Sequence, residues 1–348
     1  GLEEKSSGIW ILDDLCFSPG DNLLDELEFD DYVLDFEITS NRPDLLSIEG
    51  IARELSVLTG KNLETPDPDF NSNQLQPAEI KIEIEDPTDT PRYSTRTLAN
   101  IDITPSCLKI QHRLSKLGLR PKNNVVDATN YTMIELGHPL HPFDLEKIKG
   151  KEINIRRART DENLTTLDGE TRSLSRENLV IADESDPIAL AGIMGGELSE
   201  VKHDTRKVLL EGACFDRARI RKSSRELGLT TDASKRFEKG MDPGKTERAI
   251  DRATEILVKQ QSLDLVSELV DSYPSPPEPK EIKLRRDRAK DLIGIELKPD
   301  EIVRILTGLD IPTTKKDENT FSTSPPNFRV DLTREIDLIE ELARIHGY

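Results

Sequence analysis

The stretch NVVDATNYTMIELGHPLHPFD, residues 124–144, passes from a helix into a turn. Its apolar residues recur at helical spacing up to Leu136, and Gly137 and Pro139 then break the helix. The break turns His141 back toward the end of that helix. Small polar residues and two histidines therefore meet within about twenty positions, which makes His141 either a site residue or a structural, hydrogen-bonding histidine.

Strands and helices mix irregularly on both sides of this stretch. Alternating apolar and polar residues predict strands at 80–84, 93–98, 152–157 and 208–210. A basic helix closing at 224–227 and a helix over 243–259, capped by Asp242, are predicted after them. Because no regular strand–helix–strand repeat is present, the sequence predicts an α+β fold rather than a doubly wound sheet.

The first part of the chain predicts a small unit of its own. Residues 33–38 alternate like a strand, and residues 45–58 have the spacing of a helix that stops at Gly60. Ser106 is placed to cap a further helix that runs to Leu117.

Two segments rich in proline and polar residues divide the chain. Residues 64–78 predict one linker, and four prolines within residues 274–279 predict a second, semi-rigid one. We therefore expect three parts, 1–72, 73–273 and 274–348. The last part, with a helix, a hairpin around 315–319 and a final helix, predicts a winged-helix-like domain of the kind that binds nucleic acids.

The charge pattern restricts the classes of partner. The chain has a net charge of −19, and residues 1–50 hold 14 acidic and 2 basic residues. This balance argues against indiscriminate binding of nucleic acid. Five basic residues within 217–225 leave two interpretations open, a solvated helix face or a local phosphate-contacting face.

Several classes of protein are excluded or disfavoured. No apolar run is long enough to span a membrane. Cys16, Cys107 and Cys214 are far apart, which disfavours a disulfide framework or structural zinc and fits a cytoplasmic protein. No phosphate-binding loop, dinucleotide fingerprint or zinc-protease motif is present. The absence of an initiator methionine predicts an excised fragment.

Two further stretches contain candidate ligand-binding groups. Residues 189–196 place three glycines in a small-residue loop, which is either a tight turn or a place where the backbone approaches a ligand. Glu211 follows an apolar strand and is expected to be buried, so it needs a partner. That partner is either a structural arginine or a hydroxyl group of a ligand.

The C-terminal segment holds the densest group of carboxylates. Asp337, Glu340 and Glu341 are spaced to share one helix face, and Asp331 precedes them. Oxygen ligands without His or Cys suit Mg²⁺. The alternative is a solvated acidic face beside Arg334 and Arg344.

These blocks together resemble the bacterial-type phenylalanyl-tRNA synthetase β subunit. The resemblance rests on residues 41–44, 124–144, 192–196, 210–216, 229–243 and 339–348, which occur in the family's order over nearly the whole chain. It implies an internal portion of that subunit, with the distal part of the N-terminal domain, a tRNA-editing domain and a small domain with a DNA-binding-like fold.

The resemblance also implies an activity and its partners. The editing domain of this family hydrolyses mischarged Tyr-tRNA(Phe), whereas ATP-dependent aminoacylation takes place on the α subunit. His141 and Glu211 match the family's catalytic and hydroxyl-recognising residues. The residues that match its substrate-binding positions are Thr129, Asn130, Ala191, Gly192 and Gly195. The expected partners are the α subunit and tRNA(Phe), with no membrane.

The same resemblance assigns the C-terminal carboxylates to a metal. Asp331, Asp337, Glu340 and Glu341 match the family's Mg²⁺ ligands, near the edge that faces the α subunit. Two other functions stay open at this point. One is a non-catalytic RNA- or partner-binding module with a vestigial pocket, and the other is a free-standing trans-editing hydrolase.

Overall fold

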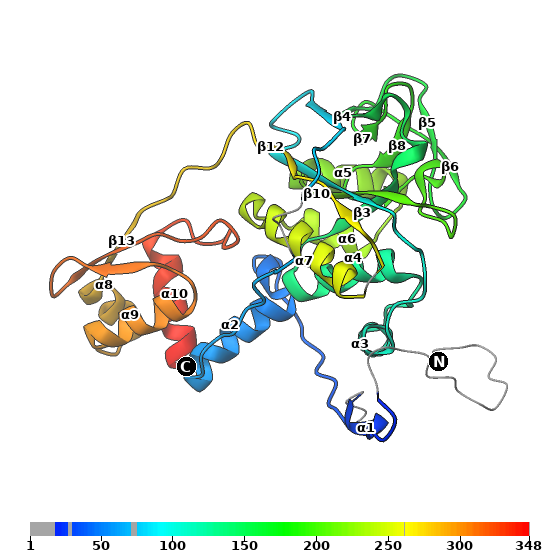
Figure 1. The fold of residues 1–348 in the computed structure, drawn as a ribbon. Helices are drawn as coiled ribbons and strands as arrows, with labels where there is room; N and C mark the ends of the chain where they lie inside the picture. Colours follow the sequence, from blue (N-terminus) through cyan, green and yellow to red (C-terminus); the bar gives the residue numbers. More distant parts are fainter. Residues whose placement is uncertain (1–17, 27–29, 71–74, 261, 348) are drawn as a thin grey trace.

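The computed structural model describes residues 18–26, 30–70, 75–260 and 262–347 (Figure 1). In this part of the chain, strands and helices alternate without a repeating unit, and the strands form separate sheets. The α+β prediction is therefore confirmed. No helix in the described ranges is long and apolar enough to cross a membrane. Cys107 and Cys214 carry free thiols, and Cys16 lies outside the described residues.

The N-terminal unit holds one substantial helix. After α1 (Leu23–Glu26) and the short 3-10 helix η1 (Pro43–Leu45), α2 runs over Ile48–Thr59. The Ser47 side chain caps its start, and Gly60 ends it in the left-handed conformation. The strand predicted at 33–38 is wrong, because this segment pairs with no described strand and leaves Val33 and Leu34 exposed.

An antiparallel sheet forms the centre of the middle part. Its longest strands, β2 and β10, pair along their full length, β3 flanks β10, and β11 and β12 both pair with β2. The strands are β2 (Arg92–Ala99), β3 (Leu140–Asp144), β10 (Lys207–Cys214), β11 (Leu265–Val266) and β12 (Val270–Ser272). Two helices, α4 (Asn124–Leu136) and α7 (Thr246–Lys259), cover one face of this sheet.

A second sheet covers the opposite face. Its strand order is β1-β4-β7-β8-β9. The β1–β4 pair is parallel, and the remaining neighbours pair antiparallel. The strands are β1 (Lys81–Ile84), β4 (Glu152–Arg157), β7 (Leu179–Ala182), β8 (Pro187–Leu190) and β9 (Met194–Gly195). The largest apolar core lies between the two sheets and includes Tyr93, Phe143, Ile181 and Leu209.

The remaining elements of the middle part are short. A hairpin of β5 (Asn163–Thr165) and β6 (Thr171–Ser173) precedes β7, and α5 (Arg217–Leu227) and α6 (Asp232–Phe237) follow β10. The helix α3 (Leu108–Lys116) starts after Cys107 rather than after Ser106. The predicted Ser106 cap is wrong because the Ser106 hydroxyl donates a hydrogen bond to Asp127 instead.

The C-terminal part combines three helices with a three-stranded antiparallel sheet. The elements are β13 (Ile282–Arg285), α8 (Arg286–Ile293), α9 (Pro299–Gly308), β14 (Thr313–Lys315), β15 (Thr320–Thr323) and α10 (Glu335–His346). Its own apolar core includes Leu284, Phe321 and Leu342. The predicted helices and hairpin are confirmed here, and Figure 1 shows this part as a separate lobe joined by a long extended connection.

Helix α2 connects the two lobes. The Val57 side chain packs into the C-terminal core, where it faces Gly308. On the same helix, Glu54 forms ion pairs with Arg42 and Arg344. At its other end, Glu49 is paired with Lys245 at the start of α7. The predicted boundary at residue 72 divides the chain in sequence. In space, however, α2 of the first part packs against both the middle part and the C-terminal part.

Candidate active site

Strand pairing brings the two central site residues together. In the register of β10 with β3, Glu211 lies directly opposite His141. Directly opposite residues of antiparallel strands project from the same face, with Cβ atoms about 5 Å apart. Leu209 and Ala213, which alternate with Glu211, pack in the core between the sheets. Glu211 and His141 therefore face the second sheet and not the helices behind the first.

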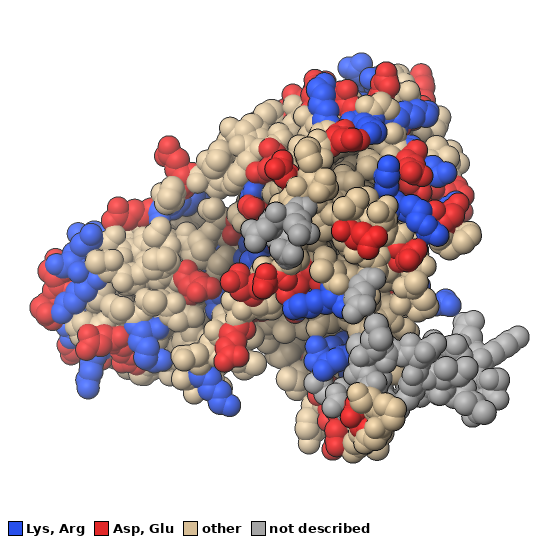
Figure 2. Space-filling view, in the orientation of Figure 1, with Lys and Arg blue, Asp and Glu red and all other residues tan. Residues whose placement is uncertain are grey.

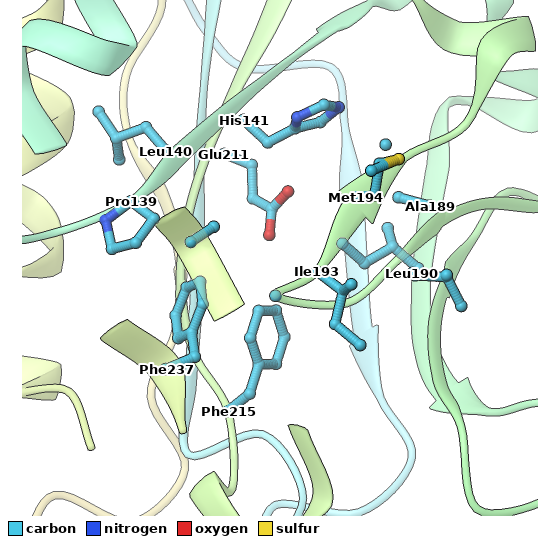
Figure 3. A pocket seen from close by; sticks show the side chains of 14 residues that line it. Pro139, Leu140, His141, Ala189, Leu190, Ile193, Met194, Glu211, Phe215 and Phe237 are labelled. Atoms are coloured by element: carbon cyan, nitrogen blue, oxygen red, sulfur yellow. The ribbon is translucent and has the colours of Figure 1, made fainter. Parts of the chain in front are cut away.

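A small pocket of about 70 Å³ opens between the sheets at this point. It is lined mostly by apolar side chains, and Glu211 and His141 are its only ionisable lining groups among the described residues. The lining residues are Pro139, Leu140, His141, Ile181, Ala189, Leu190, Gly192, Ile193, Met194, Gly195, Glu211, Phe215, Ala233 and Phe237. Figure 3 shows the Glu211 carboxyl extending among these side chains, with the His141 ring above it.

Two glycines shape this pocket. Gly192 has φ of +66° in the turn between β8 and β9, and a Cβ there would lie 3.0 Å from ring carbons of Phe215 and Phe237. At Gly195 a side chain would overlap the His141 ring. The glycine loop is thus a tight turn that also allows the backbone to approach the aromatic rings and His141.

The environment of Glu211 decides one alternative that the sequence left open. Burial raises the pKa of Glu211 to about 8. In the described chain no arginine or lysine pairs with it, so a structural arginine is not its partner. Burial also lowers the pKa of half-buried His141 to about 4, and its ring packs edge-on against Phe143. Near neutral pH both groups are therefore largely uncharged.

Comparison with known proteins connects this geometry to a family. Residues 89–262, which contain the whole pocket, match the sequence profile of the B3/4 domain. The chain belongs to the B3/4 domain family. Residues 282–348 match a second profile, that of the tRNA synthetase B5 domain. The two matches fall in the two lobes, on either side of the proline-rich connection.

Relatives of known name match over the whole chain. It is 41% identical over 353 residues to the phenylalanine–tRNA ligase beta subunit of Syntrophus aciditrophicus and 42% identical over 348 residues to that of Thermotoga maritima. Each match covers 100% of this chain and 44% of the relative, so the chain spans less than half of their length. The resemblance to the bacterial-type β subunit is thereby confirmed.

A solved structure is similar over most of the chain. It is an N-terminal fragment of the phenylalanyl-tRNA synthetase beta subunit from Pyrococcus horikoshii. Its TM-score is 0.45 and its sequence identity 17%, and the match covers 89% of this chain and 85% of that fragment.

Three of the expected substrate-binding residues do not line the pocket of the B3/4 domain. Thr129 and Asn130 lie on α4, where the Thr129 hydroxyl donates a hydrogen bond to the Val126 carbonyl. Ala191 is buried in the β8–β9 turn beside Gly192. The roles of these three residues come from the resemblance and stay predictions.

Other lining residues were missed by sequence reasoning. Phe215 follows β10 directly, and Phe237 ends α6, so their rings meet with centroids 5.1 Å apart. Both lie within the sequence blocks that carry the resemblance, but nothing in their local pattern marks an aromatic pocket wall. Their proximity depends on how α6 folds back toward β10.

The carboxylates of the B5 domain do not form a ligand set. Glu341 is buried and accepts hydrogen bonds from Arg329 and Arg344, at 2.9 and 2.7 Å. Although burial opposes it, these contacts lower the pKa of Glu341 to about 2. Asp331 also pairs with Arg329.

The other two carboxylates are separated from this pair. Asp337 accepts hydrogen bonds from the backbone N–H groups of Thr333 and Arg334, just before α10, and Glu340 is exposed. In the described ranges no group of three or more His, Cys, Asp or Glu side chains is placed to hold a metal. The arrangement therefore does not fit Mg²⁺, because arginines already neutralise the buried carboxylates. Magnesium binding here stays a prediction from the resemblance.

The basic helix α5 is partly neutralised within the B3/4 domain. Arg219 pairs with Asp89, and Lys222 pairs with Glu177. On the face drawn in Figure 2, acidic and basic side chains are interspersed over both lobes. The two ion pairs of α5 with acidic residues of its own domain favour a solvated helix face over a continuous phosphate-binding surface.

Proposed function

We propose that this chain is the hydrolytic editing part of a phenylalanine–tRNA ligase β subunit, and that its pocket removes tyrosine from mischarged tRNA(Phe). The observation that supports this proposal is the single buried carboxyl of Glu211 in an otherwise apolar, aromatic-walled pocket. A phenyl ring fits such walls, and a carboxyl without a protein partner requires a polar group from the ligand.

The physical basis of selection is the phenolic hydroxyl. An apolar synthetic site discriminates poorly against a substrate that only adds a hydroxyl group. A second site that requires the hydroxyl discriminates much better, because phenylalanine would leave Glu211 buried and unpaired. Glu211, protonated near neutral pH, can donate a hydrogen bond to the phenol oxygen or accept one from its proton.

The pocket residues also support a non-covalent mechanism. Among the described lining residues there is no Ser, Thr, Cys or Lys that could act as a nucleophile, so the attacking group is water. His141, with its pKa lowered to about 4, is neutral and can accept a proton or a hydrogen bond from that water.

The glycine turn supplies a further polar group. The Gly192 backbone N–H makes no hydrogen bond within the described chain. It can donate one to the ester carbonyl as negative charge develops there during hydrolysis. We assign orientation of the ester to this turn.

The partners follow from the same proposal. The α subunit would carry the aminoacylation site, and tRNA(Phe) would deliver its 3′ end to the pocket in the cytoplasm. The B5 domain, with its helices and three-stranded sheet, would act as the winged-helix-like module expected from the sequence and contact tRNA or the α subunit. The match to less than half of each relative agrees with a portion of a larger subunit.

Deacylation of Tyr-tRNA(Phe) by the intact αβ enzyme tests this function. Glu211→Ala should reduce the selectivity for Tyr-tRNA(Phe) over Phe-tRNA(Phe) about tenfold to a hundredfold, the value of a strong hydrogen bond. Asp291→Ala, which removes an exposed carboxylate of α8 in the other lobe, is the control and should leave selectivity unchanged. Normal selectivity in Glu211→Ala would refute the proposal.

The same assay separates the remaining functions. A wild-type enzyme that does not deacylate Tyr-tRNA(Phe) would indicate a vestigial pocket in a binding module. Full activity of the chain alone, without the α subunit, would indicate a free-standing hydrolase. The proposal expects activity in the αβ enzyme.

A further inference from the structure

The row that holds Glu211 and His141 extends to a third strand. On the other side of β10, Thr95 of β2 lies directly opposite Glu211. Tyr93 lies opposite Ala213, one step further along the same face, and its ring packs in the core between the sheets. Thr95, Glu211 and His141 thus form one transverse row, with Tyr93 diagonal to Glu211.

Two hydroxyl groups on this face are fully buried. Thr95 and Tyr93 are both 0% exposed. Within the described chain, neither the Thr95 Oγ1 atom nor the Tyr93 hydroxyl has a hydrogen-bond partner. A buried hydroxyl without a partner costs free energy, and native proteins normally satisfy such groups with protein atoms, ordered water or a ligand.

The unpartnered groups lie next to one another. Glu211 also has no polar partner in the described chain. Burial first, and then the Glu211 carboxylate wherever it is ionised, raise the pKa of Tyr93 well above its ordinary value. Tyr93 therefore keeps its proton and stays a hydrogen-bond donor. Three buried polar side chains thus lie on one face of two neighbouring strands, with Thr95 directly opposite Glu211 and Tyr93 diagonal to it, where one water or ligand hydroxyl could satisfy several of them.

We propose that Thr95 and Tyr93 are positioning residues for Glu211, whose hydroxyls hold its carboxyl, directly or through one buried water, in the orientation that recognises a phenolic hydroxyl. This inference rests on the proposed function and deepens it. It assigns two residues of β2 a role in the substrate selectivity of the pocket, although neither of them lines the pocket itself.

The competing explanation is that the two hydroxyls are unsatisfied buried groups without a role in recognition. If the two hydroxyls had no role toward Glu211, removing them would relieve a burial cost and would leave selectivity untouched. Thr90 offers a matched control, because its hydroxyl is also 0% exposed and unpartnered in the described chain but lies before β2, outside the row.

The test uses shape-matched variants in the intact αβ enzyme. Thr95→Val and Tyr93→Phe each remove one hydroxyl, Thr95→Ser retains it, and Thr90→Val is the control. The ratio of kcat/KM for Tyr-tRNA(Phe) to that for Phe-tRNA(Phe) is measured for each, together with the temperature of unfolding.

Thr95→Val and Tyr93→Phe should lower this ratio about three- to tenfold, as expected for the loss of a hydrogen bond. Thr95→Ser should keep the ratio near wild type, and Thr90→Val should not change it. Unchanged selectivity in both Thr95→Val and Tyr93→Phe, with equal or higher unfolding temperatures, would overturn the inference.

The outcomes for Glu211→Ala keep the two proposals apart. If Glu211→Ala loses selectivity and the β2 variants keep it, only the positioning role fails. If Glu211→Ala also keeps selectivity, the proposed function itself fails. Should Thr95→Val not fold, Tyr93→Phe still decides the outcome.

Discussion

Replacing Glu211 by Gln should stabilise the protein relative to wild type, and this advantage should grow as the pH rises. The substitution keeps the shape of the side chain and removes its ability to ionise. In the folded protein burial raises the pKa of Glu211 from its ordinary 4.5 to about 8, so the folded state holds this proton over a pH range in which the unfolded chain has lost it. Wild-type stability therefore falls between about pH 4.5 and pH 8, and the Gln variant lacks this loss.

The size of the effect follows from the pKa difference. Each pKa unit corresponds to about 1.4 kcal/mol, so the gap between 4.5 and about 8 amounts to at most about 5 kcal/mol. Near pH 4.5 both side chains are neutral in the folded protein, and the two proteins should have similar stability. The advantage of the Gln variant should grow up to about pH 8 and stay constant above it.

Urea unfolding of the two proteins at pH 5, 7 and 9 measures this difference directly. All other titrating groups are common to both proteins and cancel when the free energies of unfolding are subtracted. Thr90→Val, which removes a buried hydroxyl and changes no ionisable group, is the control and should show no pH-dependent difference. Parallel pH profiles for wild type and Glu211→Gln would show that Glu211 ionises normally, and the argument for a partnerless carboxyl would be wrong.

Three further outcomes are expected. His141→Ala should slow hydrolysis of Tyr-tRNA(Phe) in the αβ enzyme and leave phenylalanine-dependent pyrophosphate exchange unchanged; equal losses in both would indicate a structural histidine. Gly195→Ala should also slow hydrolysis, because the added methyl group overlaps the His141 ring, and a wild-type rate would argue against this packing. Glu341→Ala should cost about 3–5 kcal/mol in urea unfolding with or without Mg²⁺, because it leaves Arg329 and Arg344 without their buried partner; stabilisation of the wild type by Mg²⁺ that the variant loses would instead support a metal site.

Local sequence signals predicted most of the helices correctly. The helix α4 ends at Gly137 in the left-handed conformation, and α9 begins with Pro299 and ends at Gly308. Both are decided by nearest neighbours in the chain, because a glycine or proline changes the allowed backbone angles wherever it occurs. The strand expected at 33–38 failed for the complementary reason, since a strand needs a partner that the described chain does not provide.

The composition, the helix ends and the blocks that carry the family resemblance were all determined by the sequence itself. Its residues also marked Glu211 and His141 as candidates, but they left the partner of Glu211 undecided. Only the tertiary structure placed Thr95, Glu211 and His141 in one row, because three strands distant in sequence pair in a fixed register.

The C-terminal carboxylates show the same division. Spacing along the chain correctly placed Asp337, Glu340 and Glu341 on one helix. It could not show that Arg329, from the segment before that helix, reaches Glu341. The carboxylates that suggested a metal include Glu341, which is neutralised by an arginine whose position depends on the packing of the domain. The energy of a charge depends on what surrounds it in space, and this is the part that a linear sequence leaves open.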